Sequence, residues 1–500
     1  MSAVPLTPSG APGGAPTGLR RDAVGLREVL FQSVTAMAPG AAIAASIPAG
    51  AAFAGGALPL SVIIAMVASL FAASSVGELA RHLPAAGSLA TYSSRGLHPA
   101  VGFLVAWGYV FVEALVPVLL LLQLGFTTAG TFNGEWHSFP AGLWWPWALI
   151  GAVIIALAGY YGVRASAGLG TVLGVFEILV FMLLAVLMII KAGSANTASV
   201  FTASHTPSTD RGAIGVIAGS VYTVLAFAGF EAAAPLAEEA RDPKRTIRKA
   251  VLGAALGVGL IYLVTTYAAA VFVGPDRFAK FTGSGPLSWE GIARSSYGLY
   301  WVLIFLAIVN STIANANAGS NASTRTAFAM GRIGVFPHAL ARTHPRHHSP
   351  VLAVALQFLV AVGATLALGF AYGPTTAFLV VATAIVVVLV LIYIVVNAAC
   401  IGFFLVARRD LFSPLRHLVF PLLGIAAFVP AWFTAAGITV FSFVFPLSKP
   451  VSYAGPAAGV WMLLGLAYLI WLYVRHPRRV VDVGVVHLDA DIDQISADTT

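Results

Sequence analysis

The sequence predicts an all-α polytopic membrane protein with twelve transmembrane helices, and two observations carry this prediction. Hydrophobic residues make up 59% of the chain and charged residues only 9%, whereas a soluble domain carries roughly 25% charged residues. Most of the 500 residues also fall into apolar runs about twenty residues long, the length that a helix needs to cross a bilayer. The mean hydropathy of +0.90 agrees with this class.

The expected spans fall into two sets of five followed by a pair. The first five are expected over 29–54, 59–81, 98–127, 141–161 and 168–191, within a first half at 26–191. The next five are expected over 213–237, 248–274, 297–324, 350–372 and 375–407, within a second half at 213–407. The last two are expected near 418–443 and 454–474, within 418–474. The length of each apolar run supports its assignment, with ends uncertain by a few residues. The connections are expected to be short, except for external loops at 192–212 and 275–296 and a polar loop at 325–349.

Both ends of the chain read as polar tails. Residues 1–25 are rich in Pro, Gly, Ala, Ser and Thr without an apolar core, so we expect a disordered cytosolic tail and not a cleaved signal peptide. Residues 480–500 are polar and mildly acidic, and we expect a second cytosolic tail. Cys400 is the single cysteine, which excludes a disulfide within the chain.

The distribution of basic residues predicts the orientation. With the N-terminal side taken as inside, all but six of the 27 Lys and Arg residues fall on that side. The six are Lys191, Arg211, Arg277, Lys280, Arg294 and Lys449. Cytoplasmic loops of membrane proteins carry an excess of Lys and Arg. We therefore expect both termini in the cytosol and a multi-pass location in the cytoplasmic membrane.

Two spans carry helix-breaking residues in corresponding places. The first reads Ala-Pro-Gly-Ala-Ala-Ile over 38–43, and the sixth reads Phe-Ala-Gly-Phe-Glu over 227–231 with Pro235 beyond. Pro removes a backbone donor and clashes with the preceding turn, and a broken helix at membrane depth must line a cavity or be buried in protein. Paired interruptions in two halves indicate a transporter site between inverted repeats. The plainer alternative is that Gly and Pro are common in membrane helices.

The two interruptions define the candidate substrate site. Unwound backbone offers amide groups to an anion and carbonyl oxygens to a cation, which suits the carboxylate and ammonium of an α-amino acid. The predicted substrate-binding residues are Pro39, Gly40, Ala41, Ala42, Ile43, Glu113, Phe227, Ala228, Gly229, Phe230 and Glu231. The phenylalanines would close the site, although ordinary packing explains either one alone.

Three carboxyl groups lie within spans, at Glu113, Glu177 and Glu231. Removal from water favours the neutral form of such a group, and acids inside membranes often mark proton relays. We hypothesise that Glu231 or Glu177 gains and loses a proton during transport. A protonated carboxyl with a purely structural hydrogen bond is the alternative. Glu113 would instead contact a substrate ammonium.

Three segments resemble the amino acid–polyamine–organocation transporters, especially bacterial amino acid permeases. They are GELARHLPAAGSLATYSSRGLHPAVGFLVAWGY at 77–109, FAGFEAAAPLAEEARDPKRTIRKA at 227–250 and RTAFAMGRIGVFPHALARTHPRHHSPVLAV at 325–354. The resemblance covers roughly residues 25–475. It implies five plus five inverted spans followed by two more, with spans 1 and 6 discontinuous. It also implies alternating-access transport of amino acids or related amines, by proton or sodium symport or by exchange.

The same resemblance bears on the coupling residues. The eighth span carries a polar stripe that includes Ser311 and Asn315. Such a stripe can coordinate a cation, although hydrogen bonding to another helix is its commoner use. In this family the eighth span contributes to the coupling-ion region, which implies that role for these two residues. Some proton-coupled members carry a Lys in the fifth span that replaces a sodium ion, whereas this chain has Glu177 at or near that position. The first span also departs from the family's Gly-small-Gly-Ile run. We expect H⁺ ahead of Na⁺ as the coupling ion.

Other classes of function fit the sequence less well. We find no nucleotide-binding loop, no Ser/His/Asp-like arrangement within a span and no metal-ligand pair at helical spacing, features expected of an ATP-driven pump or a membrane enzyme. A channel would show filter-like loops or charged rings. The expected partners are a small substrate, an amino acid or an amine, and the lipid bilayer. No nucleic acid, cofactor, metal or obligatory protein partner is expected, and a polyamine permease stays open as the runner-up.

Overall fold

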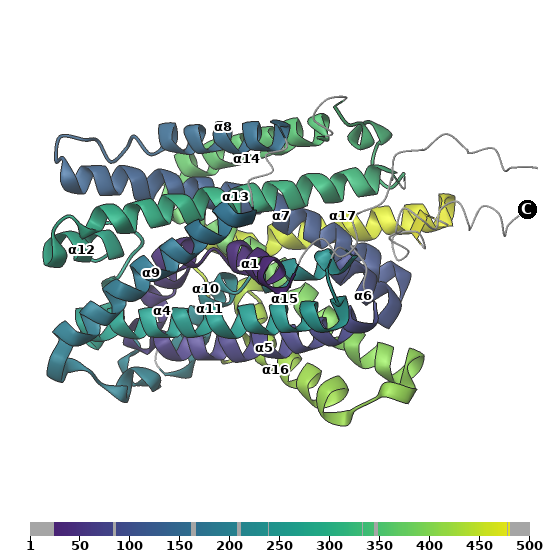
Figure 1. The fold of residues 1–500 in the computed structure, drawn as a ribbon, viewed down its shortest axis with the longest axis horizontal. Helices are drawn as coiled ribbons and strands as arrows, with labels where there is room; N and C mark the ends of the chain where they lie inside the picture. Colours follow the sequence, from purple (N-terminus) through teal and green to yellow (C-terminus); the bar gives the residue numbers. More distant parts are fainter. Residues whose placement is uncertain are drawn as a thin grey trace, which may run out of the picture.

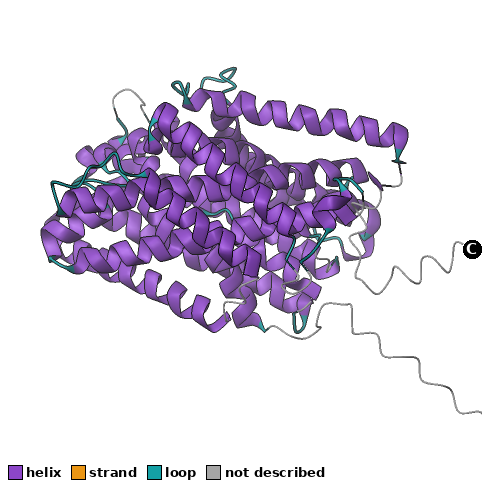
Figure 2. Cartoon of the chain, turned by 90° about the horizontal axis from the view of Figure 1, so that it is seen from above, coloured by secondary structure: helices purple, strands orange, loops and turns teal. Residues whose placement is uncertain are grey.

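The computed structural model describes residues 25–83, 87–161, 167–207, 212–238, 240–332, 334–344, 349–477 and 479–480. The tails expected over 1–25 and 480–500 lie outside this part apart from Gly25 and Val480. Val480 is buried against the end of the last span. Figure 2 shows helices and connecting loops throughout the described residues.

The α-helices are numbered in chain order, and those of the first half come first. They are α1 (Leu26–Met37), α2 (Pro39–Ala41), α3 (Ile47–Ala49), α4 (Ala51–Ala54), α5 (Leu58–His82), α6 (Ser88–Gly96), α7 (Pro99–Glu135), α8 (Trp145–Tyr161) and α9 (Ala167–Ala192). The remainder are α10 (Ala213–Ala226), α11 (Pro243–Val273), α12 (Trp289–Tyr297), α13 (Tyr300–Arg332), α14 (Val351–Tyr372), α15 (Pro374–Gly402), α16 (Phe420–Ala436) and α17 (Ala454–Arg475).

Short 3₁₀- and π-helical pieces join or extend these helices. The π-helical pieces are η1 (Ala42–Ser46), η9 (Phe403–Ala407) and η11 (Leu415–Val419). The 3₁₀ pieces are η2 (Gly55–Ala57), η3 (Gly193–Ala195), η4 (Ala198–Phe201), η5 (Ala203–His205), η6 (Phe230–Glu238), η7 (Pro275–Lys280), η8 (His338–Ala341), η10 (Arg409–Leu411) and η12 (Val451–Tyr453).

Eleven helical segments in the described part are long and apolar enough to cross a membrane. The helix α8 is also apolar but has only 17 residues. The long helices run side by side along one direction, with α8 and α14 at one edge and α5, α11 and α16 at the other (Figure 1). Between these edges lie α1, α10 and α15, so the interrupted helices are enclosed by the rest of the bundle. The chain is a multi-pass membrane protein.

The helix α7 shows how local sequence positions a long span. Pro99 stands at its first turn, where a missing N–H is harmless, and the His98 side chain accepts a hydrogen bond from the Ala100 N–H. Pro117 inside the helix cannot donate to the preceding turn. Close to this turn Gln357 of α14 donates to the Ala114 carbonyl oxygen at 3.1 Å, so α14 bonds to the α7 backbone there. A Cβ at Gly319 would stand 2.6 Å from Val116, so α13 packs tightly on the same turn.

Two tryptophans fasten the last span to the third. The Trp107 indole N–H donates to the Trp461 carbonyl at 2.9 Å, and the Trp461 indole N–H donates to the Trp107 carbonyl at 3.1 Å. The two rings stack with centroids 4.8 Å apart. A buried indole needs a partner for its N–H, and this reciprocal pair satisfies both while holding α17 against α7.

Short helices within the connections were not predicted. The segment 275–296, expected to be an external loop, folds into η7 and begins α12, and the connection between the second and third spans contains α6. Trp289 of α12 is 2% exposed and donates from its indole N–H to the Ile43 carbonyl at 2.9 Å. The loop is therefore packed into the bundle beside the first span. The third span is also longer than expected, at Pro99–Glu135 in place of 98–127.

Candidate functional site

The first span is interrupted at Ala38, between α1 and α2. Ala38 has φ +45°, in the left-handed region, and its N–H bonds to the Thr35 carbonyl at 3.1 Å. The expected unwinding over Pro39–Ile43 is wrong, because these residues are helical, in α2 and then η1. The physical reason is that Pro starts a helix readily and disfavours the α-helical conformation in the residue before it. The break therefore precedes the proline.

The sixth span is interrupted where the sequence predicts it. The helix α10 ends at Ala226, a turn follows over Phe227, Ala228 and Gly229, and the chain continues as the 3₁₀-helix η6 from Phe230. Gly229 has φ +103°, a conformation that a side chain opposes. Pro235 lies inside η6. The interruption therefore combines a glycine turn with a change of helix type.

The two interruptions lie against each other. A Cβ at Gly229 would stand 2.6 Å from the Ala36 carbonyl carbon, so the turn of the sixth span touches the backbone of α1. Ser33 of α1 donates to the Phe230 carbonyl at 2.7 Å and accepts from the Ala233 N–H at 3.0 Å. These contacts join α1 to η6. The backbone groups of η6 that a regular α-helix would have bonded are thus satisfied by a neighbouring span.

The other halves of the two spans also meet. A Cβ at Gly50 would stand 2.8 Å from the Gly219 carbonyl oxygen, and one at Gly219 would stand 2.7 Å from the Ala54 Cβ. Small residues let membrane helices approach closely. The segment after the first break is therefore packed on α10 through glycine and alanine.

Tyr262 of α11 connects both interruptions. Its side chain is fully buried, and its hydroxyl lies 3.0 Å from the Met37 carbonyl oxygen and 2.9 Å from the Ala226 carbonyl oxygen. These carbonyls belong to the last residues of α1 and α10, which end at the two breaks. The ring packs edge-on against Phe227 at 5.4 Å. The single hydroxyl proton is thus shared between two carbonyl oxygens. Both carbonyls lie at helix ends, where the usual backbone donors are missing.

A first cluster of buried acids lies beside the sixth-span break. One Glu231 carboxyl oxygen accepts from the Tyr393 hydroxyl at 2.9 Å and from the Gly229 N–H at 3.1 Å. Glu231 is 3% exposed. The Glu113 carboxyl of α7 lies within electrostatic range of Glu231 and next to the Tyr109 hydroxyl. Two acids and two tyrosines, from α7, η6 and α15, are therefore gathered around one break.

A second cluster lies beside the first-span break. Glu177 of α9 is 3% exposed and accepts from the Asn310 side-chain N–H at 3.3 Å. The Gly40 backbone amide and the Ser311 side chain face the same carboxyl. A Cβ at Gly40 would stand 3.1 Å from Ser311. The Ser311 hydroxyl oxygen is buried beside this carboxyl and does not complete a hydrogen bond of good geometry.

Most of the predicted site residues come together in these clusters. Ala41 and Ile43 present carbonyl oxygens that accept from Gln123 at 2.9 Å and from Trp289 at 2.9 Å. Phe227 and Phe230 are fully buried and pack on Tyr262 and Tyr393. Pro39 and Ala42 are buried in the same segment, Ala228 is half-buried in the turn, and Asn315 lies about one turn beyond Ser311, half-buried.

Sequence reasoning missed several polar residues of the site. They are Ser33, Tyr109, Gln123, Tyr262, Trp289, Asn310 and Tyr393. A signal existed for most of them, because a lone polar side chain within an apolar span needs a buried partner. The sequence alone does not say which carbonyl or carboxyl that partner is.

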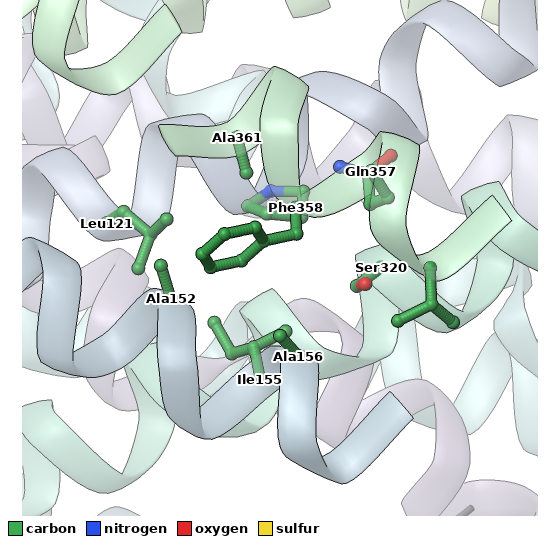
Figure 3. Close-up of a pocket in the computed structure, with 10 residues that line it drawn as sticks. Leu121, Ala152, Ile155, Ala156, Ser320, Gln357, Phe358 and Ala361 are labelled. Atoms are coloured by element: carbon green, nitrogen blue, oxygen red, sulfur yellow. The ribbon is translucent and has the colours of Figure 1, made fainter. Parts of the chain in front are cut away.

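A small cavity lies apart from these clusters, between α7, α8, α13 and α14 (Figure 3). Phe358 and Gln357 point into it from α14, opposite Ala152 and Ile155 of α8. Its volume is about 10 Å³, which is close to the space of one water molecule. No residue that lines it is charged. It is a packing defect beside the Pro117 turn and too small for an amino acid.

Metal chemistry finds no support in the described residues, where no group of three or more His, Cys, Asp and Glu side chains is placed to hold an ion. In the basic loop after α13, His344 packs against Tyr160 at 5.6 Å. His347 and His348 of that loop lie outside the described residues. The partners of the buried acids of the site are instead tyrosine, asparagine, serine and backbone groups.

The bundle and its paired interrupted helices define a membrane transport protein. The family model described as amino acid permease matches residues 28–480. The chain belongs to that family, and thus to the amino acid–polyamine–organocation superfamily.

Three relatives illustrate the similarity. The low-affinity putrescine importer of Escherichia coli K12 is 28% identical over 322 residues, which cover 63% of this chain and 68% of the relative. The branched-chain amino acid permease of Bacillus subtilis is 27% identical over 330 residues, covering 61% and 66%. The histidine permease of Lactococcus lactis is 27% identical over 282 residues, covering 55% and 58%.

Proposed function

We propose that this chain is a secondary active transporter that moves amino acids across the cytoplasmic membrane by alternating access. The observation that carries the proposal is the meeting of two interrupted helices at Tyr262, which bonds to the last carbonyl of α1 and of α10. Discontinuous helices at a repeat interface are where transporters of this general type hold substrate and coupling ion. Membership of the amino acid permease family supports the substrate class.

The architecture that we propose has twelve spans. Counting the 17-residue helix α8 with the eleven longer ones gives that number, and the polar tails then lie on the same side. The first five spans, within 26–191, and the next five, within 213–407, would form the two inverted halves, and 418–474 the final pair. The excess of Lys and Arg on the side of the termini supports a cytosolic location for both ends.

The site chemistry suits an α-amino acid. We place the substrate carboxylate where the first span restarts as a helix at Pro39. The Gly40 backbone amide there bonds to the Glu177 carboxyl and would exchange that partner for the substrate. We place the substrate ammonium toward Glu231 or Glu113, whose carboxyls lie beside the second break. The residues around the breaks are mostly small and apolar, which favours a small or apolar neutral side chain.

A second candidate is transport of an organic amine. Two carboxyl groups, Glu113 and Glu231, lie within electrostatic range of one another together with two tyrosine hydroxyls. Such a pair matches a cargo that carries positive charge without a carboxylate. The similarity to a putrescine importer agrees with this candidate.

Coupling to protons is proposed to run through Glu177 or Glu231. Each is nearly fully buried, and each accepts hydrogen bonds from neutral donors, Asn310 in one case and Tyr393 in the other. A proton can therefore be taken up or released without breaking an ion pair. The alternative coupling ion is Na⁺, held by Ser311 and nearby carbonyl groups. A third possibility is that no ion is coupled and one substrate is exchanged for another.

Proteoliposomes that contain the purified protein test these assignments. Labelled amino acids and, separately, labelled putrescine are offered under an imposed proton gradient, under a sodium gradient and with no gradient but internal substrate. Amino acid uptake driven by the proton gradient supports the proposal, and uptake of amines alone promotes the second candidate. If labelled substrate enters only in exchange for internal substrate and neither gradient has an effect, the transport mechanism is antiport and not symport. If the proteoliposomes transport neither amino acids nor putrescine, the proposal is overturned.

A further inference from the structure

A strongly basic cavity lies at the end of α5 and the start of α11, away from the interrupted helices. It has a volume of about 280 Å³ and is lined by Arg81, Lys244, Arg245, Arg248 and Lys249. The two helices that form it are packed against each other along their length. No acidic side chain lines it. The cavity is therefore a concave surface made from cationic groups of two spans, to which the proposed function assigns no role.

The charge of this cavity is only partly balanced. Arg248 pairs with the buried Glu78 carboxylate at 3.3 Å, and Arg245 lies 3.9 Å from Asp242, with both of the latter exposed. Among the described residues, no carboxylate pairs with Arg81, Lys244 or Lys249. Counted over the described residues, five cationic side chains thus face two carboxylates, a formal excess of three positive charges in this cavity.

The backbone fixes where these charges stand. Pro243 begins α11, so the first-turn N–H groups of this 31-residue helix lie beside the cavity and add the positive end of the helix to the side-chain charge. A Cβ at Gly77 would stand 3.0 Å from the Arg248 Cγ, so the stem of Arg248 lies directly on α5. The carboxylate of Glu78 then holds its guanidinium group in place. Arg248 is a fixed anchor, and the lysines around it are free to close on an anion.

We propose that this cavity binds a phosphate group. A dense set of Arg and Lys donors next to a helix N-terminus matches the charge and the several acceptor oxygens of a phosphate ester. Two sources carry that chemistry, the headgroup of an anionic lipid and a soluble phosphate. Arg81 ends a span and Lys244 begins one, which places the cavity at a membrane surface where basic pockets between spans can take a lipid headgroup.

The test measures binding and does not depend on transport. The thermal unfolding midpoint of the purified, detergent-solubilised protein is followed as inorganic phosphate, short-chain phosphatidylglycerol or short-chain phosphatidylcholine is added. A ligand that binds the folded state raises the midpoint with its concentration. Stabilisation by phosphatidylglycerol but not by inorganic phosphate identifies a lipid site, and stabilisation by both identifies a general phosphate site. If neither inorganic phosphate nor phosphatidylglycerol stabilises the protein more than phosphatidylcholine, the proposal is overturned.

A triple variant and a matched control locate the effect. The variant is Arg81→Gln, Lys244→Gln and Lys249→Gln, which removes the three charges that lack a partner. The control is Arg409→Gln, Arg416→Gln and Arg475→Gln, which removes three exposed charges from other connections. We expect the variant to need about tenfold more ligand, which is about 1.4 kcal/mol of binding free energy, and the control to match the unaltered protein. Equal weakening in both, or in neither, overturns the assignment to this cavity.

Discussion

Replacing Tyr262 by phenylalanine tests whether the two interruptions depend on one side chain. The change removes only the hydroxyl group that lies 3.0 Å from the Met37 carbonyl and 2.9 Å from the Ala226 carbonyl. The ring stays and keeps its edge-on contact with Phe227. A buried acceptor left without a donor costs about 1 to 3 kcal/mol. Since 1.4 kcal/mol is a factor of ten in an equilibrium, the broken conformation should lose roughly one to two powers of ten in relative population.

Three measurements follow from this reasoning. The thermal unfolding midpoint of Tyr262→Phe should fall, and backbone amides near Ala38 and Gly229 should exchange hydrogen faster, because the helix ends are no longer held. Substrate uptake in proteoliposomes should fall about tenfold or more. Neither of the first two readouts needs the substrate to be known.

The matched control lies on the same helix. Tyr267→Phe also removes one hydroxyl of α11, which donates to the Asn196 side chain at 3.2 Å in a peripheral loop. We expect this variant to keep both uptake and exchange near those of the unaltered protein. If Tyr262→Phe behaves like Tyr267→Phe in stability, exchange and uptake, the hydroxyl does not hold the two breaks and the reasoning fails.

Three further predictions concern the turn, an outer acid and the inner acids. Gly229→Ala should lower the unfolding midpoint strongly, because a Cβ there meets the α1 backbone at 2.6 Å and the residue has φ +103°. The control is Gly257→Ala, which should be neutral or slightly stabilising because a Cβ at Gly257 has nothing within 4 Å. Equal effects of the two substitutions would contradict the packing. Burial raises the pKa of Glu290 in α12 from 4.5 to about 7. An acid with a raised folded-state pKa stabilises the fold fully below its unfolded pKa and progressively less as pH rises toward the folded value. The unfolding midpoint should therefore decline between pH 4.5 and about 7, and Glu290→Gln should flatten that decline; an unchanged slope would refute it. Finally, Glu177→Gln or Glu231→Gln should remove the pH dependence of uptake, and full pH-dependent uptake in both variants would end the proton-coupling proposal.

The sequence predicted the class of fold because its signals are local. Apolar runs of about twenty residues need no knowledge of their neighbours, and Pro and Gly report directly on the backbone. Gly229 accordingly lies in a turn with positive φ, at the expected position. The first break was expected to extend over Pro39–Ile43 but is confined to Ala38, because Pro39 acts on the residue before it.

The rest of the candidate site depends on contacts between distant spans. Tyr262 and Tyr393 lie in ordinary apolar helices, and nothing in their own neighbourhoods states that one bonds to helix ends and the other to Glu231. Trp289 sits in a connection whose polar composition suggested a surface loop, yet its indole is buried against the first span. Such partners are set by packing, which periodicity does not encode.

The contacts of Ser33 and Gly219 reduce the number of independently moving parts. Ser33 ties α1 to η6, whereas Gly219 and Gly50 press the later segment of the first span against α10. The four pieces of the two interrupted spans thereby form two composite rods. One rod consists of α1 and η6, and the other consists of the later segment of the first span and α10. The rods share a boundary that runs through Ala38 and Gly229, which both have positive φ. Bending along that boundary would turn both spans together, because each rod contains a piece of each span.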